Sequence, residues 1–302
     1  MEGGENMTAN RQKRGIIEMS ICATLWSLGG IFIKIIPWNP LVIAGARSIL
    51  ASCVIAIYMK AAHMHFRINK EVLLGGIFLA GDLLLIVSAN KFTTAANATM
   101  LQFTSPIFIL LISIFFLHET FRRSDIIAVA ACVFGIALFF FDQLSFGNIF
   151  GNIMATLSGL SLSVMYIITG NANEDNRMSS ILIGHMLTAA IGLPFAFVFD
   201  TPISGISMVS ILILGILQIG IPYVLYGLAA KDCSPLMCSL IAALEPILNP
   251  VWVFFFNGEQ PGLFALIGGV VVIATISIWC VWKERHPVPT AKEPGVQQEY
   301  NG

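Results

Sequence analysis

The sequence alternates between long apolar runs and short polar connections, and this alternation limits its fold more than any other feature. Apolar windows of about 20 residues, the length that crosses a bilayer as a helix, recur along the whole chain. There are ten: 16–35, 40–59, 71–90, 94–117, 124–141, 148–169, 179–200, 207–229, 234–256 and 261–282. Only 11% of the 302 residues are charged, whereas soluble domains carry about 25%. The sequence therefore predicts an all-α polytopic membrane protein with ten transmembrane helices.

Both ends of the chain are polar. Residues 1–15 are polar and basic, and the apolar run that follows is long enough to span and lacks an A-x-A-like cleavage site. We interpret this run as a retained transmembrane helix and not as a signal peptide. The tail at 283–302 is polar and contains three prolines, so we predict that it is disordered.

The distribution of Lys and Arg predicts the orientation, because cytoplasmic loops carry an excess of these residues. With a cytoplasmic N-terminus, thirteen of them fall on the inside and only Lys91 falls outside. The inside set is Arg11, Lys13, Arg14, Lys60, Arg67, Lys70, Arg122, Arg123, Arg177, Lys231, Lys283, Arg285 and Lys292. We therefore expect a multi-pass protein of the cell (inner or plasma) membrane with both termini in the cytoplasm.

The two halves of the sequence resemble each other. A shift of 140 residues aligns Pro106 with Pro246 and Glu119 with Glu259. The proline and the glutamate are separated by twelve residues in each half. We predict two repeats of five helices, 16–141 and 148–282. An odd number of helices per repeat inverts the second repeat in the membrane, a layout typical of secondary transporters.

Three stretches resemble the drug/metabolite transporter (DMT) superfamily of the EamA type. They are ATLWSLGGIFIK (23–34), SPIFILLISIFFLHE (105–119) and LEPILNPVWVFFFNGE (244–259). Arg47 in the second helix adds to the likeness, which extends over about 15–285. The resemblance implies a ten-helix exporter of small metabolites with a central cavity between the repeats. Within this pattern Pro106, Glu119 and Glu259 are a structural signature of the repeats.

Glu245 is the strongest candidate for a functional residue, because a charge inside a bilayer is costly. It lies near the middle of the window 234–256, beside Pro246 and one turn before Pro250. Prolines free backbone carbonyls one turn earlier, and broken helices are tolerated where they line a cavity. We expect Glu245 and Pro246 to line a substrate or ion site. The alternative is a structural kink with a protonated or hydrogen-bonded Glu245.

Arg47 and Asp82 are expected at matching depths, about 10–12 Å from the outer ends of their helices. An ion pair between them would either brace the first repeat or open during transport. Lys34 lies near the outer end of the first helix. It either snorkels to the interface or attracts an anionic group at the outer mouth.

Several amphipathic side chains complete the candidate transport pathway. Some of them should face the cavity, and the aromatic ones near helix ends could equally anchor the protein at the interface. They are Trp26, Gln102, Tyr223, Tyr226, Asn249 and Trp252. His185 is expected to be a hydrogen-bonded core histidine.

These features favour a secondary transporter that exports small metabolites, such as amino acids or related amphipathic compounds, by alternating access. The alternatives are an integral membrane enzyme or a channel. No nucleotide-binding loop occurs, which disfavours ATP as the direct energy source. The expected partners are a small-molecule substrate and the lipid bilayer, and an oligomer is possible but not required.

The sequence offers no support for catalytic residues, a cofactor or a bound metal. The six cysteines form no CxxC pair and lie mostly in apolar runs, as small buried hydrophobes do. The net charge of −1 gives no indication of nucleic-acid binding.

Overall fold

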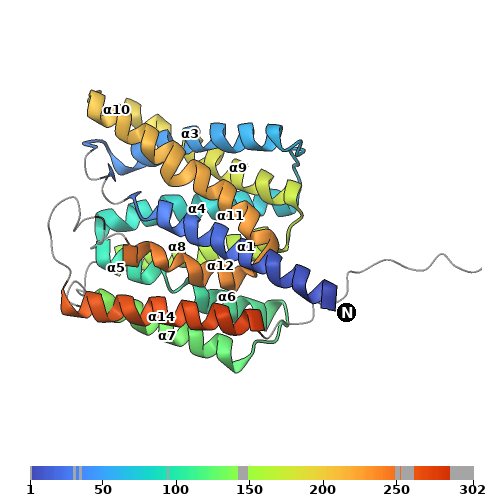
Figure 1. The fold of residues 1–302 in the computed structure, drawn as a ribbon. Coiled ribbons are helices and arrows are strands. Elements are labelled where there is room, and N and C mark those ends of the chain that lie inside the picture. The colour runs from blue at the N-terminus through green and yellow to red at the C-terminus, as the bar shows by residue number, and fades with distance from the viewer. Residues whose placement is uncertain are drawn as a thin grey trace, which may run out of the picture.

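The computed structural model of the chain is a set of helices packed side by side (Figure 1). It describes residues 2–29, 32–33, 36–93, 95–141, 149–248, 252 and 262–285, and no strand occurs among them. The elements of the first half are α1 (Glu2–Trp26), α3 (Pro40–Ala61), α4 (Lys70–Phe92), α5 (Ala95–Gln102), α6 (Ser105–Phe116) and α7 (Arg123–Phe139). Those of the second half are α8 (Ile149–Asn171), α9 (Glu174–Gly192), η2 (Leu193–Phe197), α10 (Gly205–Leu212), η3 (Ile213–Gly220), α11 (Ile221–Asp232), α12 (Pro235–Ala242) and α14 (Leu263–Arg285).

Within the described residues, seven helical segments are long and apolar enough to cross a membrane. They are Pro40–Ala61, Lys70–Ala89, Asn97–Phe116, Ile149–Asn171, Glu174–Phe197, Gly205–Asp232 and Leu263–Lys283, and a shorter apolar helix covers Pro235–Leu248. Large apolar side chains such as Phe116 and Phe197 are exposed on the outside of the bundle, as lipid-facing residues are. The chain is therefore a multi-pass membrane protein, while the count of ten spans stays a prediction.

Two of the predicted windows are interrupted where uninterrupted helices were expected. The window 94–117 divides into α5, which ends at Gln102, and α6, which begins at Ser105. Pro106 is the second residue of α6 and has no N–H to pair with the carbonyl of Gln102. The helix predicted to reach residue 35 instead runs from Glu2 to Trp26, through the polar N-terminal segment, and ends in a turn before Gly29. Glycine favours such a helix end.

The window 207–229 contains a π-helical segment, η3, between α10 and α11. Pro222 follows it and offers no N–H to the carbonyl of Gln218. One α-helical hydrogen bond is therefore missing where η3 meets α11. π-Turns occur often at functional sites, and η3 contains one polar side chain, Gln218.

Helices of the two halves interlock and form two helix groups. In the first group α4 packs against α8 and α9, and α8 also packs against α5 and α6. In the second group α1 packs against α11 and α12, and α3 packs against η3. Exchanging the two halves turns the α4–α8 contact into the α1–α11 contact, and the α4–α9 contact into the α3–η3 contact. This correspondence is the one expected of two five-helix repeats, whose bounds and inverted arrangement stay predictions.

The two groups meet where α3 crosses α9. A Cβ added to Gly45 would lie 2.6 Å from the main-chain nitrogen of Leu193 and 2.9 Å from the carbonyl carbon of Gly192. Any side chain at Gly45 would therefore push the helices apart. Close backbone approach through glycine is a common way to pack helices in membranes.

A separate pair, α7 and α14, lies side by side at the edge of the bundle (Figure 1). The buried Asp125 of α7 forms a salt bridge with Lys283 at 3.1 Å and accepts a hydrogen bond from Nε1 of Trp279 at 3.0 Å. The carboxylate of Asp125 on α7 thus contacts two side chains of α14, and these contacts stabilise the packing of the two helices.

Candidate substrate-binding cavity

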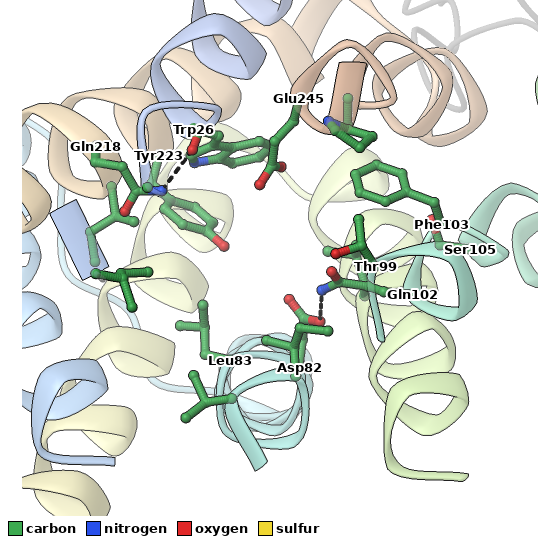
Figure 2. Close-up of a pocket in the computed structure, with 18 of the residues that line it drawn as sticks. Trp26, Asp82, Leu83, Thr99, Gln102, Phe103, Ser105, Gln218, Tyr223 and Glu245 are labelled. Carbon is green, nitrogen blue, oxygen red and sulfur yellow. Dashed lines mark hydrogen bonds between the residues drawn. The ribbon is translucent and has the colours of Figure 1, made fainter. Parts of the chain in front are cut away.

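A cavity of about 590 Å³ lies between the two helix groups. Most of the side chains proposed from the sequence line it: Trp26, Arg47, Asp82, Gln102, Tyr223, Glu245 and Pro246. Figure 2 shows Glu245 and Asp82 on opposite sides of the cavity, with Trp26 and Tyr223 along one wall. The cavity extends toward the end of the bundle where α3 begins, because Ile33, Pro40 and Val87 also line it. We call this end the open end.

The carboxylate of Glu245 points into the cavity (Figure 2). The chain turns at Ala243, directly after α12, and this turn together with Pro246 places Glu245 at an irregular point of the helix. Among the described residues Glu245 has no hydrogen-bond or salt-bridge partner. An acid in this setting has an unfilled capacity to bind, because a charge removed from water needs a partner.

Asp82 is held by neutral donors and not by a cation. Its Oδ1 atom accepts hydrogen bonds from the hydroxyl of Ser158 at 2.6 Å and from Nε2 of Gln102 at 2.8 Å. These donors come from α8 and from the end of α5, so Asp82 connects three helices of the first group. The ion pair between Arg47 and Asp82 that matching depths suggested is not formed. Depth alone does not determine which helices face each other.

Arg47 is almost completely buried, with 7% of its surface exposed. Its one hydrogen bond is weak, from Nη1 to Oε1 of Gln218 at 3.3 Å. The Nε atom is buried and has no partner among the residues that the structure describes. Since a guanidinium carries five N–H donors, most of its capacity remains available at the cavity wall.

Gln218 is a site residue that the sequence reasoning missed. Its side chain lies on η3 and joins the Nη1 atom of Arg47 to the backbone, because Nε2 donates to the carbonyl of Trp26 at 3.0 Å. That carbonyl belongs to the last residue of α1, where helical partners are missing. A lone amide within the apolar stretch ILGILQIGIP (213–222) was the available signal.

Aromatic side chains form one wall and the floor of the cavity. The rings of Trp26 and Tyr223 are 5.2 Å apart, and His185 packs behind Tyr223 with its ring 4.5 Å away. The hydroxyl of Tyr166 is buried and has no hydrogen-bond partner in the described part of the chain, so it is a further polar group at the floor that could bind a ligand. His185 lies 3.5 Å from the Ser48 hydroxyl and is fully buried, as expected for a core histidine.

Other residues proposed from the sequence lie outside the cavity lining. Tyr226 is fully buried below the floor and bonds to Thr169, and the indole Nε1 of Trp252 donates to Ser27 at 2.7 Å. Glu119 is exposed in the connection that follows α6. Lys34, Asn249 and Glu259 fall outside the described residues, as do Pro250 and the tail from residue 286.

Residues able to hold a metal are not grouped in the part of the chain that the structure describes. No set of three or more His, Cys, Asp or Glu side chains comes together there. What the cavity brings together is one guanidinium, two carboxylates, amides and aromatic rings. This composition suits a small organic molecule with charged groups and an apolar part.

Comparison with known proteins places this arrangement in a family. Residues 13–141 and 149–280 each match the EamA-like transporter family. Two uncharacterized transporters of Archaeoglobus fulgidus are similar: one is 25% identical over 66% of this chain and 71% of its own length, the other 23% over 85% and 94%. The uncharacterized transporter YxxF of Bacillus subtilis is 22% identical over 76% of this chain and 75% of its own.

A solved crystal structure described only as that of a protein shares the fold. It superposes with a TM-score of 0.77 over 91% of this chain and 99% of its own, at 16% sequence identity. The fold is therefore one already observed by experiment.

Proposed function

The chain belongs to the EamA-like transporter family, and on this premise we propose that it exports a small zwitterionic metabolite, such as an α-amino acid, by alternating access. Membership makes it a membrane transporter. The proposal adds the substrate class, the direction and ten helices arranged as two inverted repeats, with both termini in the cytoplasm. The small molecule and the bilayer are its proposed partners.

One observation carries the substrate class: the cavity contains an unfilled cationic group and an unfilled anionic group. Arg47 has an unpartnered Nε, and Glu245 has no hydrogen-bond or ion-pair partner among the described residues. A carboxylate can bind the fork of a guanidinium through two parallel hydrogen bonds. An ammonium group on the same molecule can pair with Glu245. A zwitterion therefore compensates both charges at once, which an uncharged molecule cannot do.

The other side chains that line the cavity determine which substituents and which size of substrate it can accept. Trp26 and Tyr223 offer aromatic surface beside the charged groups, and aromatic rings favour apolar or cationic side chains. Oδ1 of Asp82 already accepts two hydrogen bonds, so we assign this residue to shaping the cavity. A volume of about 590 Å³ lies within the usual range of small-molecule sites.

The proposal is tested by flux through the purified protein in liposomes. The flux of radiolabelled amino acids is compared with that of their amides and their decarboxylated amines. We expect the zwitterionic amino acids to move much faster than the analogues that carry a single charge. Glu245→Gln is expected to lower zwitterion flux by about tenfold to a hundredfold, because it removes a charge-assisted contact. Glu119→Gln is the matched control, since Glu119 is exposed outside the cavity.

Two outcomes would overturn the proposal. Equal flux of amides, amines and amino acids would remove the zwitterion as the substrate class. Flux without saturation or counter-transport would indicate a channel and not a carrier. Direction is read from liposomes in which each orientation of the protein is inactivated in turn by a reagent that cannot cross the bilayer.

A further inference from the structure

The end of the bundle opposite the open end is sealed by contacts between the two helix groups. We call it the closed end: it contains the end of α8, the start of α9, the end of α11 and the start of α12. Below the cavity floor the hydroxyl of Tyr226 on α11 bonds to Oγ1 of Thr169 on α8 at 2.5 Å. The rings of Tyr166 and Tyr226 are 5.2 Å apart and meet edge to face. Both tyrosines are almost completely buried.

Two charged contacts reinforce this seal nearer the surface. Lys231 of α11 forms a salt bridge with Glu174 at the start of α9. Nη1 of Arg177 on α9 donates to the carbonyl of Gly227 on α11 at 3.3 Å. Each contact joins the first helix group to the second.

The predicted repeat identifies the positions at the open end that are equivalent to the contact residues of the closed end. The shift of 140 residues aligns Ile86 with Tyr226 and Val87 with Gly227. Ile86 and Val87 of α4 line the open cavity, whereas Tyr226 and Gly227 of α11 touch the neighbouring group. Equivalent positions therefore line the cavity at one end and make contacts between the two groups at the other. An inverted repeat that alternates between two states is expected to exchange these two conditions.

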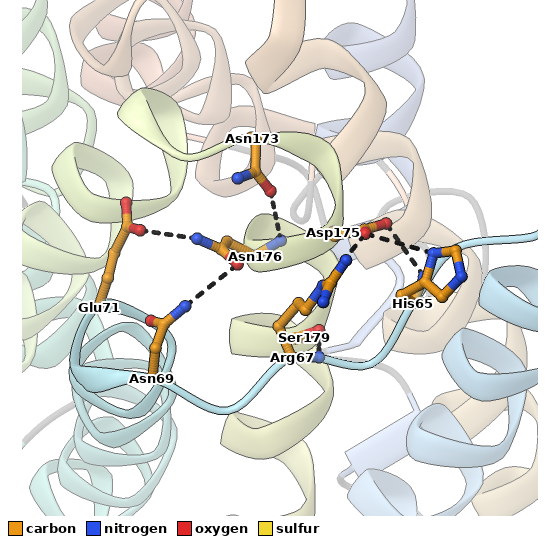
Figure 3. Close-up of polar contacts among 8 residues, drawn as sticks. All are labelled: His65, Arg67, Asn69, Glu71, Asn173, Asp175, Asn176 and Ser179. Carbon is orange, nitrogen blue, oxygen red and sulfur yellow. Dashed lines mark hydrogen bonds and ion pairs between the residues drawn. The ribbon is translucent and has the colours of Figure 1, made fainter.

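The structure also indicates which helices move together. Figure 3 shows a polar network that ties the start of α4 to the start of α9. Asn176 donates to Glu71 at 2.9 Å and accepts from Asn69 at 3.3 Å. Asp175 accepts from the main-chain nitrogen of His65 at 3.1 Å and lies 3.5 Å from Nε of Arg67. The bonds of Asn176 hold the start of α4 to α9, and those of Asp175 hold the connection before α4 to α9. We therefore expect α4 and α9 to move as one body and this network to stay closed when the seal opens.

We propose that Tyr226–Thr169, Lys231–Glu174 and Arg177–Gly227 form the gate of the closed end, which separates when the first helix group moves against the second. The inference rests on the alternating access proposed above. It adds the residues that seal one state and the division of the helices into two moving bodies. The contact of α4 with α8 lies within one body and is retained in both states.

Two disulfides of nearly identical geometry test this division. A Cβ built on Gly170 of α8 lies 3.8 Å from Cβ of Pro235 on α12. A Cβ built on Gly81 of α4 lies 3.9 Å from Cβ of Ser161 on α8. Both separations match the usual disulfide value of about 3.8 Å. The variant Gly170→Cys/Pro235→Cys joins the two groups across the gate, and Gly81→Cys/Ser161→Cys joins two helices of one group.

The experiment oxidises each double variant in liposomes, in a Cys53→Ser background because Cys53 is exposed, and confirms the bond by peptide mass spectrometry. The bond across the gate is expected to lower flux at least about tenfold, since gating motions must precede release. A reductant restores flux, and ligand binding from the open end persists. The bond within one group leaves flux within about twofold of the reduced protein.

Unchanged flux with the bond across the gate formed would overturn the inference, and so would equal loss from both bonds. A second readout does not depend on the substrate. Cys238 is fully buried on α12, and Tyr226→Phe is expected to raise its labelling by a maleimide that cannot cross the bilayer, added at the closed end. Failure of the zwitterion to move at all would count against the proposed function, while the labelling would still decide the gate.

Discussion

Arg47 and Arg177 are both buried arginines, and their surroundings differ in one respect. Arg177 is 4% exposed and gives its donors to three backbone carbonyls: Thr169 at 2.7 Å, Ala172 at 2.7 Å and Gly227 at 3.3 Å. Arg47 is 7% exposed and has one hydrogen bond within the described ranges, to the side chain of Gln218. The contrast separates a buried arginine whose donors are bound within the fold from one with donors left over, and only the second lies in the cavity lining.

The carbonyls around Arg177 explain its role. The carbonyls of Thr169 and Ala172 lie at and just beyond the end of α8, where helical carbonyls have no partners, so the guanidinium caps that helix. The same side chain reaches α11, which makes it both a cap and a contact across the closed end. Arg47 caps no helix end among the described residues, and it lies in the lining of the cavity.

The largest expected effect is a loss of stability in the variant Arg177→Met. Three carbonyls would lose their donors, at a cost of about 3 kcal/mol at about 1 kcal/mol each. Thermal unfolding of the detergent-purified protein should shift to lower temperature, with ligand affinity of the folded fraction nearly unchanged. A stable variant with lost affinity would erase the contrast between the two arginines.

Arg47→Met is expected to do the opposite. Ligand affinity should fall by about a hundredfold, because the charge-assisted contact to the substrate carboxylate is lost. The unfolding temperature should hold or rise, since a buried charge with unfilled donors is removed. Arg47→Lys keeps the charge without the fork, so an intermediate loss is expected. Equal affinity of all three proteins in titration calorimetry would exclude Arg47 from the site.

Gln218→Leu is expected to have the next largest effect, and it tests whether Arg47 depends on its hydrogen-bond partner. It removes the one hydrogen bond of Arg47 and the donor to the Trp26 carbonyl. We expect affinity to fall by about tenfold through misplacement of the guanidinium. Zwitterions should lose this affinity, whereas amines without a carboxylate should bind as before. Equal losses for both ligand classes would indicate general damage to the cavity.

The smallest effect is expected for Asp82→Asn. Both neutral donors bind the same oxygen, Oδ1, and the amide of asparagine keeps an acceptor at that place. Affinity should change by no more than about threefold, in contrast to Glu245→Gln. A loss as large as that of Glu245→Gln would make Asp82 a contact of the substrate and revise the charge complement of the cavity.

Several site residues could be identified from the sequence because the signal is local. Glu245, Arg47 and Asp82 stand out as charges within apolar windows, and all three line the cavity. Gln218 was missed because a neutral amide in such a window is a weaker signal. Arg177 was counted among the loop charges, since it lies near a window's edge, yet it is buried.

The sequence by itself determined the membrane environment and the positions of the apolar segments, because hydrophobicity is a property of the chain taken residue by residue. The tertiary structure alone decided the partners. The depth of a residue in the membrane does not say which way its side chain faces or which helices are its neighbours. Asp82 therefore accepts hydrogen bonds from Ser158 and Gln102 and does not pair with Arg47. The packing of the helices thus left Arg47 and Glu245 with capacity to bind a substrate.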